Sequence, residues 1–138
     1  MNWPVPQAGM LINYSYLWGR EAALGQEEGI KDRPCAVVIA KTDKDGKLNL
    51  RVLPVTHRPP LLPDEAVEIP APIKARLGLD EARSWVVLSE LNEFPWPGPD
   101  VRPLERGGSP IYGFLPNNFF RHILQQMAKR RVRVTRRT

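Results

Sequence analysis

Two short segments of the sequence carry residue types that suit chemistry at a phosphate group. Arg33 stands before a proline and an apolar run, and Thr56 and His57 follow a Pro-Val pair. A guanidinium stays protonated and offers several donors in a fixed fork that fits phosphate oxygens. A threonine hydroxyl can donate to the same oxygens, and a histidine beside them can carry a proton near neutral pH.

Each of these residues also has a structural interpretation, and the sequence leaves the choice open. Arg33 could form an ion pair with Asp32 or Glu28 that pins the preceding loop. Thr56 could make a local bond to the backbone at the end of a strand. His57 could be a surface residue next to the proline-rich stretch that follows it.

Other classes of chemistry have little support. The single cysteine, Cys35, lies in an apolar run and is expected to be a buried thiol. One cysteine cannot form an internal disulfide, and we expect no metal site and no cofactor. The first residues have no basic or apolar leader, and no stretch approaches the roughly 20 apolar residues of a membrane span. We therefore expect a cytoplasmic protein that does not enter a membrane.

The composition restricts the fold. The chain has 138 residues, enough for one domain, and its 15 prolines exclude a bundle of long helices. Alternating or continuous apolar runs predict short strands, and the Asp-Gly pair at 45–46 predicts a hairpin. The expected strands span residues 9–18, 34–40, 48–55, 66–69 and 84–91, with a helical turn at 72–77, a long polar loop at 19–32 and an amphipathic helix at 116–131.

These elements predict a mainly β fold: a small antiparallel sheet of five to seven short strands closed by a C-terminal α-helix. We expect a single domain over residues 1–131 and a basic tail over 132–138. The tail either trails free or, because residues 132–135 alternate, adds an edge strand.

The net charge of +5 is unevenly distributed. Eight basic residues and no acidic residue follow Glu105, whereas residues 1–105 hold twelve basic and fifteen acidic residues. A basic end on a mildly acidic body favours a polyanion or an acidic protein as partner. The alternative is a solvated tail that aids solubility.

The order of several segments resembles the MazF/PemK toxin family of type II toxin–antitoxin systems. A strand opening with Gly9 is followed by Arg-Pro-Cys-Ala-Val-Val at 33–38 and by Leu-Pro-Val-Thr at 53–56. Ala-Val-Glu-Ile at 66–69 and Trp-Val-Val-Leu at 85–88 come next. The resemblance covers roughly residues 9–92.

The resemblance implies an SH3-like β-barrel that forms a homodimer and cleaves single-stranded RNA without a metal ion. In this family the ribose 2′-oxygen attacks the adjacent phosphorus and leaves a cyclic phosphate and a 5′-hydroxyl. Arg33 and Thr56 match the family's active-site positions, and His57 is added here as a catalytic candidate outside the family pattern. The RNA-binding candidates are Lys31, Arg58, Trp96 and Asn92, with Trp18 as an alternative stacking platform to Trp96. An acidic antitoxin protein is the expected protein partner.

The sequence departs from the family at one strand end. Asn92 stands where PemK-type members have an arginine, and Pro95 where they have an aspartate proposed for acid–base work. A ribonuclease would then depend on Arg33 and Thr56, with His57 or Glu93 moving the proton.

Two other functions remain open. One is a non-catalytic module that binds nucleic acid or protein on the same barrel. The other is a topoisomerase poison like the CcdB relatives of the fold, whose C-terminal Trp-Gly-Ile-type end this chain lacks. The four acidic residues of the loop at 19–32 also oppose tight RNA binding unless that loop moves aside.

Overall fold

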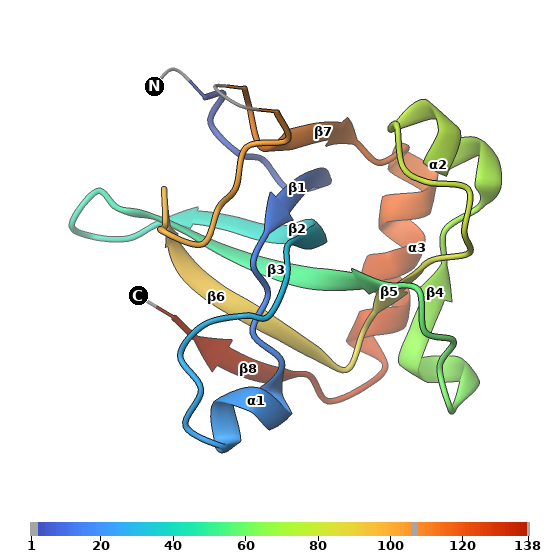
Figure 1. Cartoon of the computed structure of the whole chain (residues 1–138), viewed down its shortest axis with the longest axis horizontal. Coiled ribbons are helices and arrows are strands. Elements are labelled where there is room, and N and C mark those ends of the chain that lie inside the picture. The colour runs from blue at the N-terminus through green and yellow to red at the C-terminus, as the bar shows by residue number, and fades with distance from the viewer. Residues whose placement is uncertain (1–2, 106–107, 138) are drawn as a thin grey trace.

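The computed structural model describes residues 3–105 and 108–137, and this part of the chain is mainly β (Figure 1). Arg106 and Thr138, which belong to the predicted basic end, lie outside the described residues. The elements follow in the order β1 (Met10–Tyr14), α1 (Gly19–Ala23), β2 (Arg33–Thr42), β3 (Leu48–Thr56), the 3-10 helix η1 (Pro63–Glu65), β4 (Ala66–Glu68), α2 (Ala71–Arg76), β5 (Trp85–Val87), β6 (Glu90–Trp96), β7 (Ile111–Phe114), α3 (Asn117–Ala128) and β8 (Arg133–Arg136).

The strands form one sheet in the order β4-β5-β3-β2-β1-β7, and β6 joins β3 to β8. All pairings are antiparallel except that of β6 with β8. The first part of β3, Leu48 to Val52, pairs with β6, and its end at Val55 and Thr56 pairs with β5. The sheet therefore branches at β3.

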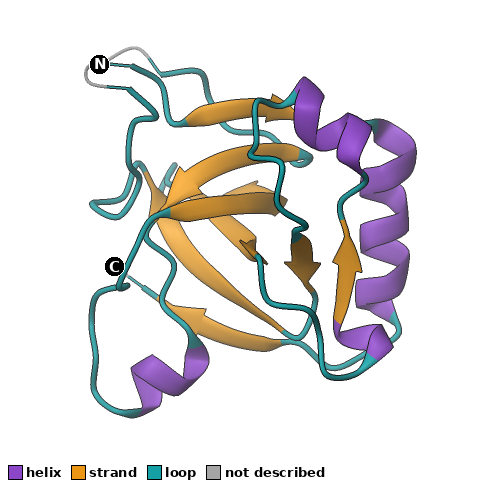
Figure 2. Cartoon of the chain, turned by 45° about the vertical axis from the view of Figure 1, so that its right-hand side comes forward, coloured by secondary structure: helices purple, strands orange, loops and turns teal. Residues whose placement is uncertain are grey.

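The mainly β class and the α-helix near the C-terminus are confirmed. Two details of the predicted fold need correction. The described residues form eight strands rather than five to seven, and the strongly twisted sheet is not closed into a barrel (Figure 2). The sheet stays open because its end strands β4, β7 and β8 each pair with one neighbour only among the described residues.

Local sequence signals account for most of these elements. Gly46 adopts a positive φ of 81° in the β2–β3 turn, as the Asp-Gly signal predicts. The amphipathic stripe of α3 packs as expected, with Phe119 and Ile123 buried. Strand β7 was not predicted, because Ile111–Phe114 is short and half exposed and lacks a clear alternation.

The core has two parts. One lies between the sheet and helices α2 and α3, which sit together at one side of the molecule (Figure 1). The other contains the stacked rings of Tyr14 and Phe94, whose centroids are 4.4 Å apart. The residues on both sides of β1, β2 and β3 are therefore buried, and this fixes the strand ends that carry the candidate site.

The C-terminal segment adds an edge strand to the sheet. Strand β8 pairs with β6, and the side chain of Arg137 is only 4% exposed. Its guanidinium donates hydrogen bonds to the hydroxyl of Tyr14 and the carbonyl of Ser15 and lies 3.1 Å from Asp100. Of the two predictions for the tail, the edge strand is therefore the one observed. No helix among the described residues is long and apolar enough to cross a membrane.

Candidate functional site

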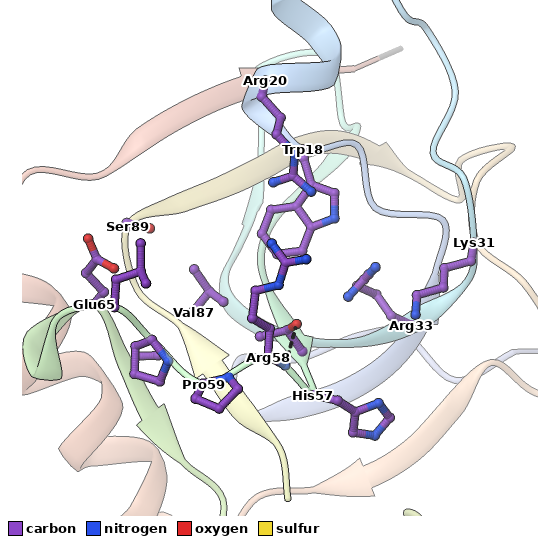
Figure 3. Close-up of a pocket in the computed structure, with 14 residues that line it drawn as sticks. Trp18, Arg20, Lys31, Arg33, His57, Arg58, Pro59, Glu65, Val87 and Ser89 are labelled. Carbon is purple, nitrogen blue, oxygen red and sulfur yellow. Dashed lines mark hydrogen bonds between the residues drawn. The ribbon is translucent and has the colours of Figure 1, made fainter. Parts of the chain in front are cut away.

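The two segments singled out by their chemistry meet at one pocket of about 430 Å³ (Figure 3). Arg33 is the first residue of β2, Thr56 is the last residue of β3, and His57 follows it directly. The two strands are antiparallel neighbours, with Cys35 opposite Pro54, so the start of β2 lies beside the end of β3. This pairing explains why residues distant in sequence line the same pocket.

Arg33 is held in place by two contacts. Its Nη1 donates to the carbonyl of Val55 at 3.3 Å, and its Cζ lies 5.0 Å from the centre of the Trp18 ring. The Nε atom is buried and has no hydrogen-bond partner among the described residues. Burial lowers the pKa of the guanidinium, which is the expected effect of desolvation on a cation. An anion entering the pocket would meet a positioned, partly desolvated donor group.

Trp18 forms an aromatic platform at the pocket wall. It precedes α1, and the carboxylate of Glu21 fixes it by accepting from the Trp18 backbone N–H at 3.0 Å. The guanidinium of Arg20 lies 5.0 Å from the ring centre, the same distance as that of Arg33. Such cation–π contacts orient both arginines around one ring.

The chain turns sharply after β3 and brings two further polar groups to the pocket. The hydroxyl of Thr56 accepts from the backbone N–H of Arg58 at 3.2 Å. This bond uses the oxygen as an acceptor and leaves the hydroxyl proton free to donate. The Arg58 side chain extends toward Trp18 across the pocket (Figure 3).

The pocket lining is strongly cationic. It includes four cations and a single carboxylate, that of Glu65. The cations are Arg20, Lys31, Arg33 and Arg58. The acidic residues of the loop at 19–32 do not line this pocket, although Asp32 lines an adjoining hollow together with Arg33 and His57. Glu21 is buried as a cap of α1, Glu27 and Glu28 line a different hollow, and Asp32 lies 3.8 Å from Arg102. The ion pairs predicted as alternatives for Arg33, with Asp32 or Glu28, are absent from the described residues.

His57 borders this pocket and a second hollow of about 250 Å³. Its Nε2 lies 2.9 Å from Oδ2 of Asp80, which belongs to the loop between α2 and β5. Asp80 was not identified from the sequence. It is separated from His57 by 23 positions, and no motif connects the two.

Two other sequence candidates, Asn92 and Trp96, lie away from the pocket. Asn92 is fully buried, and its amide bonds the backbone N–H and carbonyl of Leu17 at 3.0 and 2.8 Å. Trp96 packs against Trp3, with ring centroids 5.9 Å apart, at the far end of β6. Trp18, the alternative platform, is the tryptophan that lines the pocket.

Glu93 and Pro95, which the sequence also singled out, lie in β6 opposite residues of β3. Glu93 forms ion pairs with Arg51 at 2.8 Å and with Arg136 at 2.9 Å. These partners, Arg51 foremost, lower its pKa, so Glu93 is not poised to accept a proton near neutral pH. Pro95 lies opposite Asn49 in the pairing of β6 with β3.

Comparison of the chain with protein-family models, with curated proteins and with solved structures gave no match. The resemblance to the MazF/PemK family therefore stays a prediction that rests on the sequence segments quoted for it. No group of three or more His, Cys, Asp or Glu side chains is arranged to hold a metal ion within residues 3–105 and 108–137.

Proposed function

We propose that this protein is an endoribonuclease that cleaves single-stranded RNA without a metal ion, as the toxin component of a type II toxin–antitoxin system. The observation that carries the proposal is the meeting of Arg33, Thr56 and His57 at one cationic pocket. Guanidinium, hydroxyl and imidazole groups are the types needed to hold a phosphodiester and move a proton. The MazF/PemK resemblance supplies the reaction type.

In the proposed reaction the ribose 2′-oxygen forms a bond to phosphorus while the bond from phosphorus to the 5′-oxygen breaks. Negative charge grows on the non-bridging oxygens, where Arg33 and the Thr56 hydroxyl donate hydrogen bonds. His57 takes the proton of the 2′-hydroxyl, and the departing 5′-oxygen takes a proton from solvent. The products are a cyclic phosphate and a 5′-hydroxyl. Lys31 and Arg58 hold neighbouring phosphates, and Trp18 offers a surface on which a base can stack.

A second candidate, a non-catalytic RNA-binding module, is favoured by one observation. The segment that would carry the second half of the family's machinery is structural here, with Asn92 buried and Glu93 in ion pairs. The same cationic pocket would then bind RNA without cleaving it.

The deciding experiment is incubation of the purified protein with a long single-stranded RNA in EDTA, followed by identification of the fragment ends. The proposal predicts cyclic-phosphate and 5′-hydroxyl ends, lost in Arg33→Ala and Thr56→Ala. Arg121→Ala removes an exposed guanidinium from α3, away from the pocket, and serves as the matched control. Binding without cleavage would favour the module. If the protein neither bound nor cleaved the RNA, both functions would be rejected.

The toxin role has its own test. Induced expression of the protein in a bacterial host is expected to arrest growth, and Arg33→Ala is expected to relieve the arrest. Equal growth of cells expressing the wild-type and Arg33→Ala proteins would contradict the toxin role. It would leave the nuclease assay to be judged by itself.

A further inference from the structure

We infer that Asp80, anchored by the buried Lys74, positions His57 so that Nδ1 is the ring nitrogen available for proton transfer at the Arg33–Thr56 pocket. The inference has two halves. The catalytic half, proton transfer by His57, rests on the proposed function, whereas the positioning half, the orientation of His57 by Asp80, does not. It assigns a positioning role to two residues that no sequence motif identifies.

The anchor is Lys74, whose side chain is only 5% exposed. Its Nζ donates to Oδ1 of Asp80 at 2.8 Å, to Oγ of Ser84 at 2.7 Å and to the carbonyl of Ala82. An ammonium group has three donors, and here all three have an acceptor. Because a buried charge is costly unless it is paired and hydrogen-bonded, Lys74 has little freedom to move.

Asp80 connects this anchor to His57 through its two carboxylate oxygens. Oδ1 faces Lys74, and Oδ2 lies 2.9 Å from Nε2 of His57. The hydrogen bond from Lys74 is the foremost reason that the pKa of Asp80 is lowered, and the neighbouring His57 adds to it. Asp80 is therefore a carboxylate that accepts hydrogen bonds on both sides.

An ionised carboxylate has no proton to donate, so it selects one form of the neutral imidazole. His57 must carry its proton on Nε2 to donate to Asp80, and the lone pair then resides on Nδ1. Nδ1 has no protein partner among the described residues. When this nitrogen takes a proton, the carboxylate also stabilises the resulting imidazolium.

The exposure of the two end groups argues for a role beyond stability. The side chains of His57 and Asp80 are 55% and 56% exposed, and ion pairs this accessible contribute little to folding. The buried Lys74 nonetheless directs its ammonium at this exposed carboxylate. The other charged or titratable groups around the hollow that His57 shares with Asp80 are Lys31, Asp32, Arg33 and Tyr112.

The catalytic half is tested by single-turnover RNA cleavage with His57→Ala, Asp80→Asn and the double variant. Loss of a general base typically costs about 100-fold or more in rate, and we expect at least a tenfold loss in Asp80→Asn. KM should not change, because Asp80 does not contact the substrate. The double variant should be no slower than His57→Ala, since Asp80 acts through His57.

Glu81→Gln is the matched control, because it removes one exposed carboxylate from the same loop and should leave the rate and the tautomer unchanged. A further loss of rate when Asp80→Asn is added to His57→Ala would overturn the inference. So would full activity of Asp80→Asn. In both cases the proposed ribonuclease function would stand.

The positioning half is tested without catalysis, by the ¹⁵N spectrum of the His57 imidazole in the full-length protein at a pH where the ring is neutral. We expect the Nε2–H form in the wild type and in Glu81→Gln, and a changed population in Asp80→Asn. An unchanged spectrum in Asp80→Asn would overturn the positioning role. An inactive wild type would reject the ribonuclease function and the proton-transfer role, and the spectrum would still decide the positioning.

Discussion

The guanidinium of Arg33 lies over the indole ring of Trp18, with 5.0 Å between Cζ and the ring centre. This contact joins the first residue of β2 to the residue that precedes α1. The guanidinium of Arg20 also lies over this ring, with its Cζ 5.0 Å from the ring centre. Trp18 therefore orients two of the four cations that line the pocket.

Replacing Trp18 with alanine is expected to weaken binding of single-stranded RNA and to slow its cleavage. Stacking of a base on an aromatic ring is typically worth about 1–3 kcal/mol, and Arg33 would also lose the surface that holds it. The measurement is RNA affinity by fluorescence anisotropy, with the RNA labelled. Trp18→Phe keeps a ring and should retain most of the affinity, while an equal loss in both variants would argue against stacking.

Salt should weaken RNA binding in proportion to the number of phosphates contacted. With four cations at the pocket, the logarithm of the binding constant should fall with the logarithm of salt concentration with a slope of about −3 for a single strand. Lys31→Ala and Arg58→Ala should each reduce the slope by about 1. Lys44→Ala, at the exposed hairpin tip, is the control and should leave the slope unchanged. If neither Lys31→Ala nor Arg58→Ala changed the slope, the RNA would bind outside this pocket.

Removal of the Arg137 side chain is expected to destabilise the fold. The side chain is 4% exposed, and its partner Asp100 is 13% exposed. Breaking such a pair leaves a largely buried carboxylate without compensation, and for fully buried pairs this typically costs about 3–5 kcal/mol. Urea unfolding of Arg137→Ala should show this loss. Arg131→Ala removes an exposed arginine nearby in the sequence and should unfold like the wild type. Similar unfolding midpoints for the two variants would contradict a stabilising role of the Arg137–Asp100 ion pair.

Protonation of Glu93 should weaken the contact between β3, β6 and β8. Arg51 and Arg136 lower the pKa of Glu93 in the folded protein. A carboxyl group with a lowered pKa stabilises the fold above its unfolded pKa of about 4.3, and this contribution is lost as pH falls through the folded value. Glu93→Gln should therefore lower the free energy of unfolding at neutral pH and lessen its decline on acidification.

Glu93→Gln and the wild type are compared by urea unfolding at neutral pH and at several pH values below about 4.3, the pKa of glutamate in the unfolded chain. Glu81→Gln removes a carboxylate from the surface and should keep the wild-type dependence. An equally steep acid dependence in Glu93→Gln and the wild type would show that other carboxyl groups account for it.

Much of the local structure could be predicted from sequence because short-range chemistry decides it. The apolar run after Arg33 forms β2, Gly46 supplies the turn conformation that the hairpin needs, and the apolar spacing from Phe119 gives α3. The branching of the sheet at β3 could not be predicted, because β5 and β6 pair with different parts of that strand and these long-range pairings form only in the folded chain.

The candidate site was predicted in part. Arg33, Thr56 and His57 line one pocket because β2 and β3 pair as the hairpin signal indicates. Asp80 was missed, since the loop after α2 approaches His57 through tertiary packing alone. Trp96 and Asn92 were selected by position in the sequence, and the structure places both away from the pocket.

The sequence by itself determined the residue types available for phosphate chemistry and the strands that bring Arg33 beside Thr56. Only the tertiary structure decided where the charge lies. The pocket draws its four cations from the part of the chain that is acidic in sum, while Arg136 and Arg137 of the basic end pair with Glu93 and Asp100. The physical reason is that electrostatic energy depends on distance in space and on exposure to water, and a sum along the sequence contains neither.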